Sequence, residues 1–454
     1  MLKVKVSLCI AFLLLFTPLL KAQINSPYSR FGVGNLYEGY PVDLAGFGGL
    51  TAASEGPTLL NYANPASYAS LQLTTLSTGA YFTDLFVTQT NSALGSSSSG
   101  NSTQGFQDGA LTNLSIAFPV IKNHWGASFG LVPYSREEYS VAQLNNTNLG
   151  YNSYDSFDDS GSLYKFYIGN GVQFKLDSLD RLNLGLNVSY LFGTFSQSDD
   201  LAFVDTFNAY NTQHMETQKV GGFIFQGGIQ YIKGFSNGAR LVFGLQGNLQ
   251  SKIPITVTNV WDRFVFQDVG NGGVKDTIEG EYNQRGTMVL PASIGGGIVY
   301  DNPTHFTIGI NYDYTNWSKF STSGDTGQVP LINTWRAAIG GQWLPDVKDY
   351  HNYFKIIKYS AGFYFEQTYL SFNNSQISGI PVNTTVPLYE YALTLGASLP
   401  LTHGPTFTRF SSLNLAVELG QRGTLKDGLL RERFLTISLG LTLNDMWFMK
   451  RKFD

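Results

Sequence analysis

The stretch "RLNLGLNVSY", residues 181–190, decides the fold class. Its even-numbered residues, from Leu182 to Tyr190, are all apolar, whereas its odd-numbered residues from Asn183 to Ser189 are Asn, Gly or Ser. Successive side chains of a β-strand point to opposite faces of the sheet. The alternation therefore predicts a strand with one apolar face and one polar face.

The same alternation recurs in "LVFGLQGNLQ" (241–250), "FTIGINYDY" (306–314), "SLNLAVELG" (412–420) and "LTISLGLTL" (435–443). The apolar face carries Leu, Ile, Val and aromatic residues, and the opposite face carries mainly Gly, Asn, Ser, Thr and Gln. Such strands are typical of membrane β-barrels, whose outer face meets lipid while the inner face lines a wet lumen. A soluble β-sandwich is the alternative fold, but its exposed face would carry more Lys and Glu.

Composition excludes several classes of protein. Charged residues make up only 14% of the 454 residues, against about 25% in a typical soluble domain. After residue 22, no segment approaches the ~20 consecutive apolar residues of a membrane helix. The formal net charge is −4, so we expect no nucleic-acid partner, which would need a basic face.

Residues 1–22 have the pattern of a secretory signal peptide. Lys3 and Lys5 precede an apolar run over 6–20, and Ala22 provides a small residue for cleavage. The only cysteine, Cys9, lies within this run, so we expect a mature chain without disulfides or cysteine-ligated metals. Together with the strand pattern, the signal predicts a protein of the cell outer membrane.

The alternating segments predict fourteen antiparallel strands and hence an all-β membrane barrel over residues 71–454. Short connectors alternate with long, polar ones, as in bacterial outer-membrane barrels, and both mature termini are expected at the short-turn end. The predicted strand centres lie near 80, 116, 130, 168, 188, 226, 245, 294, 309, 338, 362, 393, 416 and 438. The segments interpreted as long polar connectors are 91–110, 143–161, 196–216, 252–286, 315–331 and 370–386.

Residues 23–70 do not alternate and mix Gly with small apolar residues and turn formers. Asn64 can cap a helix, Pro65 suits the first helical position, and Ala66 permits close packing. A fourteen-stranded barrel is wide enough to leave an open channel. We therefore expect residues 23–70 to fold inside the lumen as an N-terminal hatch, or plug.

Three stretches carry a resemblance to a known family: "GFGGLTAA" (46–53), "NYANPAS" (61–67) and "GASFGLVPY" (126–134). With the strand layout, they resemble the FadL-type outer-membrane transporters of long-chain fatty acids and other hydrophobic compounds. The resemblance implies a fourteen-stranded barrel and a hatch whose Asn-Pro-Ala motif is here Asn64, Pro65 and Ala66. The polar segment 143–161 departs from the helices and apolar capture groove that this family places there.

Pro133 lies in the third predicted strand. Proline cannot donate a ladder hydrogen bond, so we expect a local disturbance of the barrel wall there, and Gly130 weakens the packing nearby. The resemblance implies that an inward kink of this strand makes a lateral exit from lumen to membrane. The candidate gate residues are Gly130, Pro133, Tyr134 and Arg136. The alternative is a bulge without transport function.

The sequence carries no recognisable catalytic or metal-binding pattern. Its five histidines are far apart, and neither a GxSxG elbow nor an HExxH motif occurs. We therefore expect no catalytic residues, no bound metal, no cofactor and no enzymatic activity.

Two functions from different classes remain open. The first is passive uptake of a hydrophobic small molecule, which implies capture outside, a hatch movement and escape through the wall into outer-membrane lipid. The second is a structural or accessory barrel in an outer-membrane protein assembly or secretion complex, with the hatch sealing the lumen.

Overall fold

The computed structural model describes the chain from residue 26 to residue 446 with interruptions. The described ranges are 26–37, 39–90, 100–146, 152–203, 210–265, 276–323, 331–346, 349, 351–373, 385–401, 411–426 and 429–446. The predicted signal peptide, residues 1–22, lies outside them. Among the described residues, none of the helices has the length and apolar character needed to span a bilayer.

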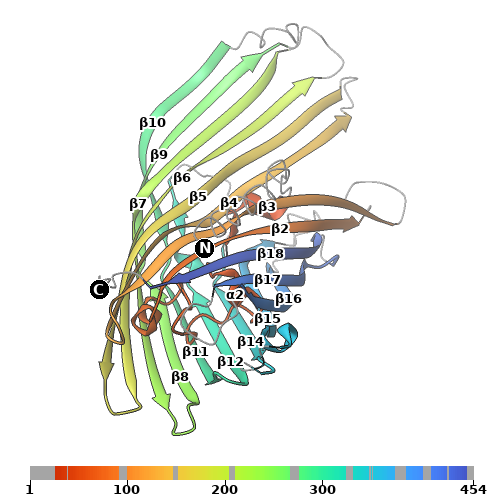
Figure 1. Cartoon of the computed structure of the whole chain (residues 1–454). Coiled ribbons are helices and arrows are strands. Elements are labelled where there is room, and N and C mark those ends of the chain that lie inside the picture. Colours follow the sequence, from red (N-terminus) through yellow and green to blue (C-terminus); the bar gives the residue numbers. More distant parts are fainter. Residues whose placement is uncertain are drawn as a thin grey trace, which may run out of the picture.

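The fold is a closed antiparallel β-barrel in which the last strand pairs with the first (Figure 1). The sheet contains 18 strands, but two of these are only two residues long, and four are halves of two interrupted barrel strands. This leaves 18 − 2 − 2 = 14 barrel strands, as predicted. In chain order they are β2 (Thr74–Thr90), β3 (Asn101–Ile121), β4 (Trp125–Asn146), β5 (Asn152–Lys175), β6 (Arg181–Phe203), β7 (Asn211–Gly234), β8 (Arg240–Asn248) with β9 (Ser251–Phe264), β10 (Asp276–Leu290) with β11 (Ser293–Asn302), β12 (Phe306–Thr315), β14 (Thr334–Trp343), β15 (Lys358–Asn373), β16 (Thr385–Pro400), β17 (Ser412–Gly423) and β18 (Arg431–Asp445).

The two faces of the wall follow the alternation in the sequence. In β6, Leu186 is 54% exposed on the outer face, whereas Asn183 and Asn187 are buried on the inner face. Toward the long-strand end the same face also carries apolar side chains, because Leu191 and Phe195 are buried inside and join a large apolar cluster. The inner face is therefore mixed in character: apolar side chains join its polar ones toward the long-strand end, where the fully buried Glu432 also lies.

Several segments predicted as long polar connectors are instead strands. β4 to β7, β9 and β10 rise together beyond the rest of the barrel at the end opposite the short turns (Figure 1). β5 alone has 24 residues, roughly 80 Å of strand, although 9–11 residues suffice to cross a bilayer. Outside the membrane both faces of a strand meet water, so the alternation fades while backbone pairing continues. The prediction of loops there was wrong for this reason.

The N-terminal segment, residues 26–37 and 39–73, packs against the inner face of the barrel wall. Its elements are η2 (Pro27–Arg30), β1 (Asn35–Leu36), α2 (Val42–Ala45) and η3 (Pro65–Ser70). Ser26 bonds to Glu432 near the long-strand end of β18, and Leu71 leads into β2 at the short-turn end. The segment therefore runs the length of the lumen, and its first described residue does not lie at the short-turn end, where the N-terminus was expected. The remaining short elements are η6 (Trp317–Lys319), β13 (Ser321–Thr322) and α3 (Tyr353–Ile356).

Candidate functional site

The Asn-Pro-Ala turn fastens the N-terminal segment to the barrel wall. The Asn64 Oδ1 atom accepts a hydrogen bond from the Ala66 backbone N–H at 3.1 Å and so caps η3. Its Nδ2 atom donates to the carbonyl of Ala52 at 2.6 Å and to that of Leu245, in β8, at 3.2 Å. Because Asn64 is fully buried, these bonds satisfy an amide that has no access to water.

Residues 42–69 of the segment follow a ring of glycines on the inner face of the wall, which we name the glycine belt. A Cβ atom added to Gly126 would lie 2.6 Å from the backbone carbon of Tyr68, and one added to Gly244 would lie 2.7 Å from the Cα atom of Ala53. Only glycine allows two backbones to approach this closely. The belt consists of Gly79, Gly126, Gly171, Gly185, Gly228, Gly244, Gly297, Gly309, Gly340, Gly362, Gly396 and Gly440.

Amide side chains of the wall satisfy backbone groups of the segment that have no secondary structure of their own. Asn187 donates to the carbonyl of Tyr62 at 3.1 Å, and Gln226 donates to that of Ala63 at 2.5 Å. Gln230 donates to the carbonyl of Ala52 at 3.0 Å. The polar face predicted for "RLNLGLNVSY" thus contributes, through Asn187, to binding the N-terminal segment.

The wall is interrupted between β3 and β4. Their ladder runs from the Ile121–Trp125 pair to the Leu114–Leu131 pair; beyond it, β3 pairs only with β2, and β4 pairs with β5 and with β1. We name this interruption the wall opening. It begins beyond Leu114, seven residues from the short-turn end of β3 at Ile121. Because a strand needs about 9–11 residues to cross a bilayer, the opening begins within the membrane-crossing part of β3. A β-bulge in the pairing of β4 with β5 falls between Pro133 and Ser135, as Pro133 predicted.

The N-terminal segment occupies the free edge of β4 at the wall opening. Asn35 and Leu36 of β1 pair with Arg136 and Ser135, and the Tyr37 N–H donates to the carbonyl of Tyr134 at 3.0 Å. We name residues 35–37 together with 39–40 the latch.

Side chains bridge the wall opening where the backbone ladder is missing. Arg136 of β4 forms an ion pair with Asp108 of β3 at 2.6 Å and a second one with Glu138. The Tyr81 hydroxyl is 2.7 Å from the other oxygen of Asp108 and 2.9 Å from the Tyr37 hydroxyl of the latch. These contacts hold the latch against β2, β3 and β4 at once.

The structure places the four predicted gate residues as follows. Pro133, Tyr134 and Arg136 lie beside the wall opening, and Tyr134 also packs against the apolar cluster of the lumen. Gly130 pairs with Ser115 inside the intact ladder, so it lies below the opening. Their role as a gate stays a prediction.

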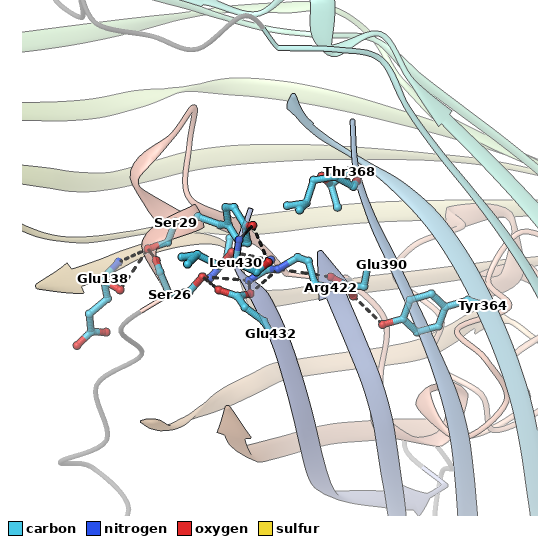
Figure 2. Close-up of polar contacts among 12 residues, drawn as sticks. Ser26, Ser29, Glu138, Tyr364, Thr368, Glu390, Arg422, Leu430 and Glu432 are labelled. Atoms are coloured by element: carbon cyan, nitrogen blue, oxygen red, sulfur yellow. Dashed lines mark hydrogen bonds and ion pairs between the residues drawn. The ribbon is translucent and has the colours of Figure 1, made fainter. Parts of the chain in front are cut away.

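A network of buried charges joins the start of the segment to β16, β17 and β18 (Figure 2). Arg422 donates through Nε and Nη2 to one oxygen of Glu432, at 2.7 and 2.6 Å, and its Nη1 donates to Asn35 of the latch at 3.0 Å. The Ser26 hydroxyl donates to the other Glu432 oxygen at 2.5 Å. Glu432 is fully buried, so its charge depends on Arg422 for compensation.

The network continues along the lumen through Tyr364. Its hydroxyl lies 2.9 Å from a carboxylate oxygen of Glu390 and 2.5 Å from one of Glu418, and the Arg336 guanidinium stacks over its ring at 4.0 Å. Arg422 lies 3.9 Å from Glu390 and so connects the two parts of the network.

Two cavities flank the latch. The opening-side cavity, about 240 Å³, is bounded by the latch tyrosines, by Val42 and by wall residues that include Tyr81, Phe434, Glu390 and Glu418. The far cavity, about 280 Å³, lies against β5, β7, β8 and β14. Leu36, Tyr37, Gly39 and Tyr40 line both, so the latch separates them.

A family model matches the whole chain, residues 1–454, and its description is BamG. The chain belongs to the BamG family. A comparison with curated proteins finds no relative.

Solved structures share the fold of this BamG-family barrel. A Pseudomonas aeruginosa FadL homologue is 15% identical, with 91% of this chain and 99% of that chain covered and a TM-score of 0.53. The Pseudomonas putida toluene transporter TodX is 13% identical (90% and 99% covered, TM-score 0.53), and the Ralstonia pickettii toluene transporter TbuX is 13% identical (90% and 98% covered, TM-score 0.51). The predicted FadL-type architecture is therefore confirmed at the level of the fold.

Sequence reasoning missed the charge network and the latch of this BamG-family barrel. One signal was available: Glu418 and Glu432 lie on the lumen face of predicted strands, where a charge needs a partner.

In the part of the chain that the structure describes, no group of three or more His, Cys, Asp or Glu residues could hold a metal ion.

Proposed function

We propose that this protein is an outer-membrane barrel through which hydrophobic small molecules pass sideways from the outside into the membrane. The observation that carries the proposal is the wall opening, which has an aromatic-lined cavity directly behind it. In this proposal the short turns face the periplasm, and the long strands project from the cell.

The N-terminal segment serves as the plug, and its two parts have different tasks. Residues 42–69, which rest on the glycine belt, block the axial route to the periplasm. The latch closes the wall opening through fewer and mostly polar contacts. A molecule that leaves sideways needs only the latch to move, so the fixed part of the plug can keep the barrel sealed.

A lateral route solves a solubility problem. A hydrophobic molecule gains little from entering a water-filled pore, because its apolar surface stays in contact with water. The opening-side cavity offers Tyr37, Tyr40, Val42 and Phe434 on its walls. In this proposal the bilayer lies just beyond the opening. The likeness to the toluene transporters TodX and TbuX supports this substrate class and a non-enzymatic role; it does not favour fatty acids over other hydrophobic compounds.

Replacing Pro133 by Val tests the proposal. Valine restores a backbone donor and favours a regular strand, so β4 should straighten and the opening should narrow. We expect the rate at which the hydrophobic dye N-phenylnaphthylamine enters cells to fall by about tenfold, equivalent to about 1.4 kcal/mol, while folding is unchanged.

The matched control is Pro119→Val, which makes the same change in β3 below the opening, where the ladder is intact but irregular. This variant should keep the wild-type rate. A correctly folded Pro133→Val barrel with undiminished dye entry would remove Pro133 from the gate.

One observation favours the second candidate function, an accessory barrel of a larger outer-membrane complex. Residues 276–285 of β10 are exposed throughout and, among the described residues, pair only with β9, which leaves a free strand edge in water. The exposed residues include Asp276, Glu279 and Glu281 against a single Arg285. Free edges are sites of strand addition by partner proteins. Stoichiometric partners after mild detergent extraction, with no dye entry attributable to the barrel, would favour this candidate over transport.

A further inference from the structure

The opening-side cavity is surrounded by more acidic than basic side chains. Glu390 and Glu418 line it directly, together with Arg136 and Arg422. Three further carboxylates bind these two arginines: Asp108 and Glu138 bind Arg136, and Glu432 binds Arg422. The balance is five carboxylates against two guanidinium groups, a formal charge of 2 − 5 = −3.

Neither arginine offers an uncommitted charge to a ligand. Arg136 is held by two carboxylates, one of them the buried Asp108, and Arg422 is held by Glu432 with Glu390 at 3.9 Å. The far cavity adds Arg336, which stacks on Tyr364, and Lys165, but also Asp313 and Glu366, so the balance stays at −3. A ligand carboxylate would therefore enter a site of its own sign and lose its hydration there.

The remaining lining favours an aromatic body and tolerates a positive charge. Tyr37, Tyr40, Tyr62 and Tyr81 contribute to the walls together with Phe434. The faces of aromatic rings attract cations, and carboxylates nearby attract them through opposite charge. A cavity of about 150 Å³ holds a benzene molecule, so about 240 Å³ accepts one ring with a short chain.

We infer that the opening-side cavity binds neutral or cationic aromatic molecules and rejects carboxylates, fatty acids included. This inference rests on the proposed function, because it assigns the chemical class of the molecule that leaves through the wall opening. The inference adds the charge of the ligand, which neither the barrel fold nor the wall opening specifies.

Three probes share a phenyl ring on a four-carbon chain and differ in charge. They are 4-phenylbutylamine, 4-phenylbutanol and 4-phenylbutyrate, which are cationic, neutral and anionic near neutral pH. Binding to the full-length mature barrel in detergent is measured by calorimetry. We expect the amine and the alcohol to bind and the carboxylate to bind at least about tenfold more weakly, a difference of about 1.4 kcal/mol.

Glu418→Gln locates the effect. Glutamine keeps an oxygen that accepts from Tyr364 but removes one negative charge, so the amine should bind about three- to tenfold more weakly and the alcohol as before. The matched control is Glu281→Gln on exposed β10, which should change neither affinity. An amine affinity unchanged by Glu418→Gln would place the binding elsewhere and overturn the assignment to this cavity.

The remaining outcomes distinguish failure of the charge assignment from failure of the proposed lateral uptake. If 4-phenylbutyrate binds as tightly as the amine, the charge class is overturned and the lateral route stands. If none of the three probes binds, both the charge class and the proposed uptake of small hydrophobic molecules are contradicted.

Discussion

A barrel that carries Gly126→Ala and Gly244→Ala is expected to conduct ions in a planar bilayer, whereas the wild-type barrel is expected to be silent. The added methyl groups would lie 2.6 Å from the Tyr68 carbon and 2.7 Å from the Ala53 Cα atom, and these are backbone atoms that cannot rotate away. Overpacking of this kind costs about 1–3 kcal/mol per site. Because the ladder of a closed barrel is stiffer than the N-terminal segment, the segment should leave the belt and open the axial route.

The matched control is Gly227→Ala with Gly341→Ala. A Cβ atom at Gly227 meets nothing within 4 Å, and one at Gly341 has its nearest neighbour at 3.9 Å. These two methyl groups should leave the barrel silent and equally stable. A folded Gly126→Ala, Gly244→Ala barrel that stays electrically silent would show that the belt is not what holds the plug.

The second large effect is expected at Arg422. Replacing it by Met leaves the fully buried Glu432 without its main counter-charge, which typically costs about 3–5 kcal/mol. Urea unfolding of the barrel in detergent micelles should show the loss as a lower midpoint. The latch should loosen as well, because Arg422 also donates to Asn35.

The double variant Arg422→Met, Glu432→Gln provides the control. Neutralising the orphaned carboxylate removes most of the penalty, so the double variant should be clearly more stable than Arg422→Met alone. If the two variants unfold at the same urea concentration, the Glu432 charge is not the source of the loss.

The barrel itself could be predicted from the sequence, because its strands obey a local rule. A strand with lipid on one side and a polar lumen on the other alternates apolar and polar residues, as in residues 181–190. All fourteen predicted strand centres fall within barrel strands. The rule fails where its physical cause is absent. In β10, residues 276–285 meet water on both faces, so nothing in their order marks them as a strand.

The candidate site was only partly predictable. Pro133 predicted a disturbance of β4 because proline lacks a backbone donor, and the structure has a β-bulge between Pro133 and Ser135. The latch could not be foreseen, since Asn35 and Leu36 become a strand only by pairing with Ser135 and Arg136, about a hundred residues further along the chain. The belt glycines were visible as part of the alternation, but a glycine does not reveal which backbone will approach it.

The most direct test of the lateral route uses a disulfide between Leu36→Cys and Ser135→Cys, which face each other across the pairing of β1 with β4. The only native cysteine, Cys9, lies in the predicted signal peptide, so no other thiol competes.

The measurement is the rate at which N-phenylnaphthylamine enters cells whose barrel is oxidised and then reduced. A Leu76→Cys, Leu443→Cys barrel, cross-linked between β2 and β18, is the control. We predict that oxidation of the latch pair slows dye entry about tenfold, that reduction restores it, and that the control pair has no effect. Equal rates for the oxidised and reduced latch pair, with the disulfide verified, would contradict a lateral route gated by the latch.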